Sequence, residues 1–137
     1  MVSCHSFKKN SMSKTIINTP NAPAPIGPYN QAILKNNTLY VSGAIAIDVK
    51  SGLMIQNDIE AETHQVMKNL CEILKAADMN YSNIVKTTIF VTDLGNFAKI
   101  NSVYGSYFTS DYPARETVQV SALPKNANVE ISVIAIK

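Results

Sequence analysis

Two charged residues near the end of the chain, Arg115 and Glu130, have the types and the spacing that could do chemistry. Arg115 follows Pro113 at the start of an alternating segment, and Glu130 lies in a second β-like run after a turn at Pro124. A guanidinium presents paired N–H donors that match a carboxylate, which a lysine cannot do. We expect a close return of the chain after Pro124 to bring Glu130 near Arg115 in one pocket. A buried salt bridge between neighbouring strands is the alternative, and the residues alone favour neither.

The strand that begins at Arg115 decides which side chains share that pocket. Because side chains on a strand alternate between faces, Arg115 and Thr117 lie on one side while Glu116 and Val118 point to the other. Glu116 is therefore expected to point away from the pocket. A bulge in the strand would instead pair Glu116 with Arg115 and weaken carboxylate binding.

Two earlier segments also offer candidate pocket residues. The segment Thr19–Pro28 holds four of the six prolines, so it is expected to form an extended loop that ends at Tyr29. Such a loop is suited to presenting the Tyr29 hydroxyl, although ordinary packing of Tyr29 in a strand is an alternative. Gly43, directly after Ser42, permits the close approach of a backbone or a ligand.

These residues must be positioned by a mixed sheet and two helices, in the order β-β-β-α-β-α-β-β, which is an α+β fold with both helices on one face. The turn Asn36-Asn37 favours a two-residue hairpin, since asparagine tolerates positive φ. Asn57 and Glu60 have the spacing of a capping box at the start of the first helix. The strands are expected at 14–18, 29–35, 38–42 with an extension to Asp48, 84–92, 115–120 and 129–134, and the helices at 57–77 and 97–108.

Helical periodicity predicts which faces of the two helices are buried. His64 falls off the apolar stripe of the first helix and is expected in solvent. Asn101 shares a face of the second helix with Phe97 and Tyr104, so it either is half-buried or lines a pocket. The aromatic residues of that helix are interpreted as core. The first stripe comprises Ile59, Thr63, Val66, Met67, Leu70, Ile73, Leu74 and Ala77.

Composition narrows the class of protein. With 137 residues, 46% of them hydrophobic, the chain is long enough for one domain with its own core. Only 16% of residues are charged, a weak indication that some surface is buried against other subunits. The net charge of +2 is scattered, so no basic stripe predicts nucleic-acid binding. The apolar runs are shorter than a membrane span.

Cysteine and histidine usage argues against metal or disulfide chemistry. Neither Cys4 nor Cys71 has metal-site spacing, and the sequence contains only His5 and His64 besides. Cys71 is interpreted as a small buried hydrophobe. We expect a reducing compartment, the cytoplasm, with the mitochondrion as a weaker alternative. Residues 1–13 are expected to be a disordered tail and residues 14–137 the domain.

Several motifs, taken together, resemble the RidA/YjgF family of reactive-intermediate deaminases over nearly the whole chain. The resemblance implies a chorismate-mutase-like fold and a homotrimer with its sites between subunits. It also implies hydrolysis of 2-enamino and 2-imino acids, such as 2-aminoacrylate, to 2-oxo acids and ammonia without metal or cofactor. That activity protects pyridoxal-phosphate enzymes from damage. The motifs are Asn21-Ala22-Pro23, Ile26-Gly27-Pro28-Tyr29, Ser42-Gly43, Ile84–Thr88, Asp93-Leu94 with Phe97, Asn101 and Tyr104, Pro113-Ala114-Arg115, Leu123-Pro124-Lys125 and Val129-Glu130-Ile131.

The resemblance also implies roles for single residues. Arg115 would bind the substrate carboxylate, and Glu130 would help to place the attacking water. The residues that would line the pocket are Tyr29, Ser42, Gly43, Asn101 and Thr117.

Three positions depart from the family pattern: Ala44 stands where glutamine is frequent, Thr117 where cysteine is frequent, and Glu116 where a small residue is usual. Two other functions remain open. One is a trimeric module that binds a small ligand or protects proteins without turnover. The other is a ribonuclease or translation inhibitor, which the sequence supports poorly because it lacks a basic groove, a histidine pair and stacking aromatic residues near Arg115.

Overall fold

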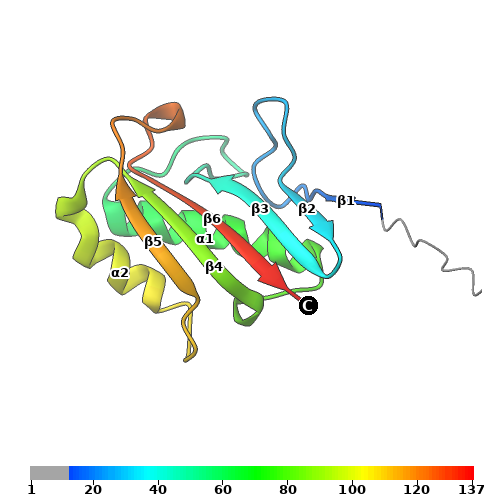
Figure 1. Cartoon of the computed structure of the whole chain (residues 1–137). Helices are drawn as coiled ribbons and strands as arrows, with labels where there is room; N and C mark the ends of the chain where they lie inside the picture. Colours follow the sequence, from blue (N-terminus) through cyan, green and yellow to red (C-terminus); the bar gives the residue numbers. More distant parts are fainter. Residues whose placement is uncertain (1–12) are drawn as a thin grey trace, which may run out of the picture.

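The computed structural model describes residues 13–137, and this part of the chain folds into one mixed sheet covered by two α-helices. The strand order is β1-β2-β3-β6-β4-β5, in which β4 and β5 are parallel and the other neighbours antiparallel. Both helices lie on one face of the sheet, α1 behind the central strands and α2 beside β5, as predicted (Figure 1). The elements are β1 (Thr15–Ile17), β2 (Ala32–Lys35), β3 (Thr38–Ala44), α1 (Ile59–Ala76), β4 (Ile84–Val91), α2 (Phe97–Gly105), β5 (Ala114–Gln119) and β6 (Val129–Ile136).

The hairpin between β2 and β3 turns on the two asparagines, as predicted. Asn36 and Asn37 have φ of 49° and 66°, the left-handed conformation that a two-residue hairpin needs. This turn fixes the register in which Ala32 faces Val41. It thereby fixes the position of the loop that precedes β2 against the end of β3.

Helix α1 buries the predicted stripe against the sheet, but its start is one residue later than predicted. Asp58 is the N-cap, and its side chain accepts a hydrogen bond from Ala61 N at 2.7 Å. The capping box between Asn57 and Glu60 was therefore a wrong prediction, because the chain turns into the helix at Asp58. His64 is exposed, as expected, and its Nδ1 lies 2.8 Å from the Tyr107 hydroxyl.

Two buried polar residues of α1, Glu62 and Asn69, lie beside the predicted apolar stripe and bind the backbone of other elements. The carboxylate of Glu62 is fully buried and accepts hydrogen bonds from Asn128 N at 2.7 Å and Asn128 Nδ2 at 2.8 Å. These bonds tie α1 to the residue directly before β6. A buried carboxylate is tolerated where its acceptor oxygens are satisfied in this way.

Several elements are shorter than predicted. The strand β2 begins at Ala32, so Tyr29 lies in the preceding loop and the alternative of strand packing for Tyr29 is wrong. The strand β3 ends at Ala44, beyond which Ile47 forms an isolated bridge with Met54. Helix α2 ends at Gly105, and Tyr107 and Phe108 pack against the core from the turn that follows.

Two remaining expectations concern the tail and the thiol. The expected disorder of residues 1–13 falls almost entirely on residues 1–12, which lie outside the described residues. Cys71 is partly rather than fully buried, with a free thiol. Within residues 13–137, neither helix is both long and apolar enough to cross a membrane.

Candidate active site

The carboxylate of Glu130 lies against the backbone of Gly43. Glu130 is on β6, on the sheet face opposite the helices, which we call the open face. Beside it, the pairing of β3 with β6 shifts register between Val41 and Ala44. This bulge brings Gly43 so close that a Cβ on it would lie 1.9 Å from Glu130 Oε1. Gly43 is therefore required by close approach of the Glu130 side chain, whereas the sequence predicted close approach of a backbone or a ligand.

The surroundings of Glu130 form a hollow of about 240 Å³, which we call the Glu130 half-site. Tyr29 reaches it from the proline-rich loop, where its hydroxyl accepts a hydrogen bond from Ile26 N at 3.2 Å. Ser42 donates its hydroxyl to Asn30 O at 2.7 Å, which holds the same loop against β3. The half-site is lined by Ile26, Tyr29, Ser42, Gly43, Ile45, Pro124 and Glu130.

Burial raises the pKa of the Glu130 carboxyl above the ordinary glutamate value. Desolvation disfavours the charged form and makes the carboxylate a stronger base. A carboxylate of raised pKa that faces a hollow is suited to taking a proton from water.

Replacing Gly43 with alanine is expected to abolish most of any activity that depends on Glu130, while the fold survives. The backbone φ of Gly43 is one that alanine adopts, and the atom in the way is the end of a flexible side chain. The carboxylate would therefore swing out of position rather than strain the sheet. Turnover and thermal melting of purified Gly43→Ala check this.

Gly52→Ala is the matched control for Gly43→Ala. Its added methyl meets open space, but the φ of 71° penalises alanine. It should therefore lose about 1 kcal/mol of stability and keep its activity, the reverse of Gly43→Ala. Equal activity in the two variants would show that the Glu130 position is unimportant.

Arg115 forms the centre of a second hollow, the Arg115 half-site, on the helix-covered face at the β5 edge. Its guanidinium carbon lies 5.0 Å from the centre of the Tyr104 ring and 5.9 Å from that of Phe97. Both aromatic residues come from α2, and Phe97 is 41% exposed. The hollow measures about 400 Å³ and is lined by Asn101, Tyr104, Gly105, Tyr112, Pro113 and Arg115.

Two buried oxygen atoms close to this half-site have no hydrogen-bond partner among the described residues. They are Asn101 Oδ1 and Thr117 Oγ1. Asn101 lines the hollow, and Thr117 follows Arg115 on the same face of β5. Buried polar atoms without partners are rare in native proteins, so the interior beside the Arg115 half-site is incompletely satisfied within the described chain.

Arg115 and Glu130 of the same chain do not line one pocket, so the prediction that the chain's return after Pro124 brings them together is wrong. Strand β4 lies between β5 and β6, because Thr87 pairs with Arg115 while Phe90 pairs with Glu130. Thr87 is fully buried under α2, whereas Phe90 faces the open side, so the two charged residues are on opposite faces. A salt bridge between neighbouring strands is excluded by the same geometry.

Glu116 points to the open face, as alternation predicted. It binds Lys86 and Thr88, both on β4, rather than Arg115. The hydrogen bond from Lys86, reinforced by Thr88, lowers the pKa of the Glu116 carboxyl. Arg115 therefore has no carboxylate partner within residues 13–137.

Sequence reasoning assigned Phe97 and Tyr104 to the core and missed their contact with the guanidinium. Tyr104 is indeed buried, but its ring face is what Arg115 lies over. The signal was present, since Phe97, Asn101 and Tyr104 follow one another at helical spacing on a single face. Ile26 and Pro124 were noted as motif residues but not as lining residues.

The fold and the two hollows define a class: a single-domain α+β protein with a guanidinium at one hollow and a half-buried carboxylate of raised pKa at the other. The Endoribonuclease L-PSP family matches residues 19–137. The chain therefore belongs to this family, the RidA/YjgF family that its motifs resemble.

Named relatives agree with this assignment. The human 2-iminobutanoate/2-iminopropanoate deaminase is 43% identical over 128 residues, which cover 93% of each chain. The structure of the Rid-family protein YyfA from Yersinia pestis is 50% identical, with a TM-score of 0.89 over 91% of this chain and 100% of that one. Escherichia coli TdcF with bound serine is 37% identical, with a TM-score of 0.86 over 90% and 98% of the two chains.

Proposed function

We propose that this chain hydrolyses 2-imino and 2-enamino acids to 2-oxo acids and ammonia. The observation that carries the proposal is the Arg115 guanidinium, held by two aromatic rings and without a carboxylate partner among the described residues. Such a group is poised to bind the carboxylate of a small ligand in bidentate fashion. The human relative is named for deamination of two 2-imino acids, and TdcF was solved with serine, which also carries a carboxylate.

The complete site is proposed to form between subunits of a homotrimer, with the Arg115 half-site of one chain facing the Glu130 half-site of the next. Several apolar side chains on the open face support burial against another copy. Tyr40 is 51% exposed, and Val118 and Ile136 are 44% and 45% exposed. Exposed apolar side chains gathered on one sheet face mark an interaction surface.

In the proposed reaction, Arg115 holds the substrate carboxylate while Glu130 takes a proton from a water that attacks the imine carbon. The water oxygen forms a bond to C2, and the π electrons of the C=N bond move to nitrogen, which takes up a proton from solvent. Glu130 then returns its proton to the amino nitrogen of the tetrahedral intermediate. The C–N bond breaks, ammonia leaves and the C2 hydroxyl loses its proton to solvent to give the 2-oxo acid. An enamine takes up the solvent proton at Cβ instead, and the resulting iminium follows the same route with no further proton uptake at nitrogen before Glu130 returns its own.

The two other functions are less well supported. Ribonuclease activity would need general acid–base residues at a basic surface, yet His64, the histidine of the described residues, is on α1 and binds Tyr107. A module without turnover would use the same carboxylate recognition, and the release of ammonia distinguishes it. For location, a reducing compartment such as the cytoplasm is proposed, which accords with the free thiol of Cys71.

Mixing two inactive variants tests both the activity and the shared site. Arg115→Ala and Glu130→Gln, unfolded and refolded together, form mixed trimers in which one site of three receives both intact residues. About three quarters of randomly assembled trimers are mixed, so about one quarter of the wild-type activity should return. Ammonia release from freshly generated 2-iminobutanoate is the measurement.

Each variant refolded alone is the control and should stay inactive. If the mixture stays inactive although mixed trimers are shown by mass spectrometry, the site is not shared between chains. If the wild-type protein releases no ammonia above the spontaneous rate, the deaminase proposal itself fails.

A further inference from the structure

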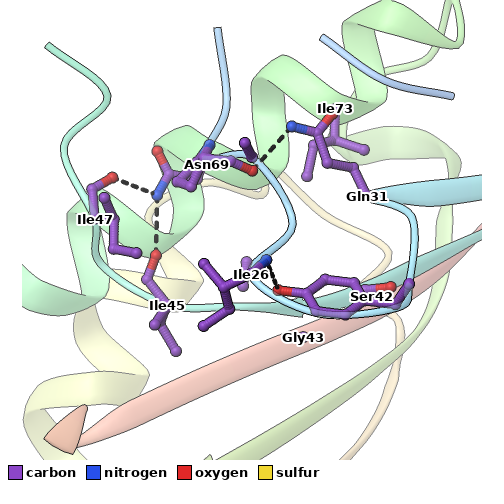
Figure 2. Close-up of a pocket in the computed structure, with 12 residues that line it drawn as sticks. Ile26, Gln31, Ser42, Gly43, Ile45, Ile47, Asn69 and Ile73 are labelled. Atoms are coloured by element: carbon purple, nitrogen blue, oxygen red, sulfur yellow. Dashed lines mark hydrogen bonds between the residues drawn. The ribbon is translucent and has the colours of Figure 1, made fainter. Parts of the chain in front are cut away.

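An apolar cavity lies directly behind the Glu130 half-site and has no role in the mechanism above. It is enclosed by the proline-rich loop, the end of β3 with the residues that follow it, and α1 (Figure 2). Its volume is about 50 Å³. It borders the half-site because the two share Ile26, Tyr29, Ser42, Gly43 and Ile45.

The amide of Gln31 lines the cavity, but its hydrogen bonds are used by the surrounding loop. Gln31 Nε2 donates to the carbonyl oxygens of Thr19 at 3.0 Å, Ala22 at 3.1 Å and Pro23 at 2.9 Å. Its Oε1 accepts from Thr19 N at 2.7 Å. Gln31 is therefore a structural clamp for the loop and offers no free donor to a ligand.

The second amide on the wall, that of Asn69, is satisfied in the same way. Asn69 Nδ2 donates to Ile45 O and Ile47 O, each at 2.9 Å (Figure 2). Its Oδ1 accepts from Gln65 Nε2 at 2.9 Å. With both amides occupied, the surface left to a ligand is mostly aliphatic, and the Ser42 hydroxyl on it is bound to Asn30 O. Tyr29, Ser42 and Gly43 form the wall shared with the Glu130 half-site, and the aliphatic part consists of Pro23, Ala24, Ile26, Ala44, Ile45, Ile47 and Ile73.

We propose that this cavity is the subsite for the side chain of the substrate, and that it selects imino acids with short, unbranched apolar side chains. The inference rests on the proposed function. The trigonal C2 carbon carries three groups. If the carboxylate lies on Arg115 and the C=N bond faces Glu130, the third group is left for the wall formed by Ser42, Gly43 and Ile45. That wall is where the cavity begins.

The size of the cavity sets the length of chain that it accepts. An apolar cavity of about 150 Å³ holds benzene, so one of about 50 Å³ has room for about two carbon atoms beyond a substrate Cβ that stays at its mouth. Each methylene that enters should raise kcat/KM about fourfold, the equivalent of burying one CH₂ group. We expect kcat/KM to rise from 2-iminopropanoate through 2-iminobutanoate to 2-iminopentanoate, and to fall for the branched 2-imino-4-methylpentanoate.

Two substitutions of opposite effect test the proposal. Ala44→Val fills the cavity from β3, where a β-branched residue suits the strand, and should remove the preference for 2-iminopentanoate over 2-iminopropanoate, a change of about sixteenfold in that ratio. Ile73→Val enlarges the cavity from α1 and should improve the hydrolysis of 2-imino-4-methylpentanoate severalfold relative to wild type. Ala76→Val, on the exposed end of α1, is the matched control and should leave the profile unchanged.

The readouts separate this inference from the proposed function. The same series of 2-oxo acids, from 2-oxopropanoate to 2-oxopentanoate and 2-oxo-4-methylpentanoate, is titrated by NMR, so that the length preference is seen in binding without turnover. In one outcome, the wild-type protein releases no ammonia yet binds the 2-oxo acids with an affinity that depends on chain length and that Ala44→Val abolishes. That result would contradict the deaminase proposal and support the subsite. Hydrolysis with a flat profile in the wild-type protein, or the same profile in folded Ala44→Val, would overturn the subsite and keep the deaminase.

Discussion

Arg115→Lys is expected to lower kcat/KM for 2-iminobutanoate by about 100-fold or more, the usual loss on removal of one well-placed donor from an active site. Lysine keeps the positive charge but offers a point charge in place of a planar fork. It also loses the stacking of the guanidinium on Tyr104 and Phe97, which fixes its direction. Steady-state kinetics over the imino-acid series measure the loss.

Stability should change little in the same variant. Replacing one residue of a buried ion pair lowers the free energy of unfolding by about 3–5 kcal/mol, because the other charge is left buried without a partner. Arg115 has no such partner within residues 13–137, so the loss is limited to two cation–π contacts of about 0.5–1 kcal/mol each. A strongly lowered melting temperature, with specific activity preserved in the folded fraction, would contradict the catalytic assignment.

The sequence offers an independent check, because Arg115 is its only arginine. An arginine-specific reagent such as phenylglyoxal should inactivate the enzyme with one modification per chain, and 2-oxobutanoate should protect against it. Modification that proceeds without loss of activity would count against a role for the guanidinium.

Glu130→Gln is expected to lower kcat by about 100-fold, the lower end of what a positioned general base contributes. Glutamine keeps the shape of the side chain and its place beside Gly43 but cannot accept the proton of the attacking water. Binding of a 2-oxo acid should be nearly unchanged, because that product needs no base. Glu60→Gln, on the exposed side of α1, is the matched control and should behave as wild type.

The raised pKa of Glu130 predicts the pH dependence of this enzyme. Since turnover needs the ionised carboxylate, kcat should rise with pH through a pKa above the ordinary value of 4.5, and Glu130→Gln should lack that limb. For stability the sign is opposite. A carboxyl whose pKa is higher in the folded state contributes stability at low pH, and this is lost as pH rises through the folded pKa. Glu130→Gln should therefore melt at the same or a higher temperature than wild type at neutral pH.

Local features of the fold could be predicted from the sequence because they depend on near neighbours. The Asn36-Asn37 turn, the buried stripe of α1 and the orientation of Glu116 all follow from backbone preference or periodicity. The placement of Arg115 and Glu130 on opposite faces could not be predicted in this way. It depends on β4 lying between β5 and β6, two strands that come later in the chain. No local pattern records which strands become neighbours.

The buried polar residues of α1 were also beyond reach from the sequence. Glu62 and Asn69 look like solvent-facing positions by residue type, and their burial is explained only by partners in distant segments, Asn128 and the residues after β3. The unpartnered oxygens of Asn101 and Thr117 are a similar case. Pattern reasoning placed both residues near a pocket but could not show that one chain leaves them unsatisfied.

The placement of Arg115 and Glu130 on opposite faces of one sheet has a consequence for the enzyme on dilution. No loop movement or side-chain rotation can bring the two groups together within a chain, because the sheet itself lies between them. In the proposed assembly, the number of complete active sites therefore depends on the concentration of protein through the equilibrium between monomer and trimer. Below the dissociation constant of the trimer, specific activity should fall steeply with protein concentration even though each chain stays folded.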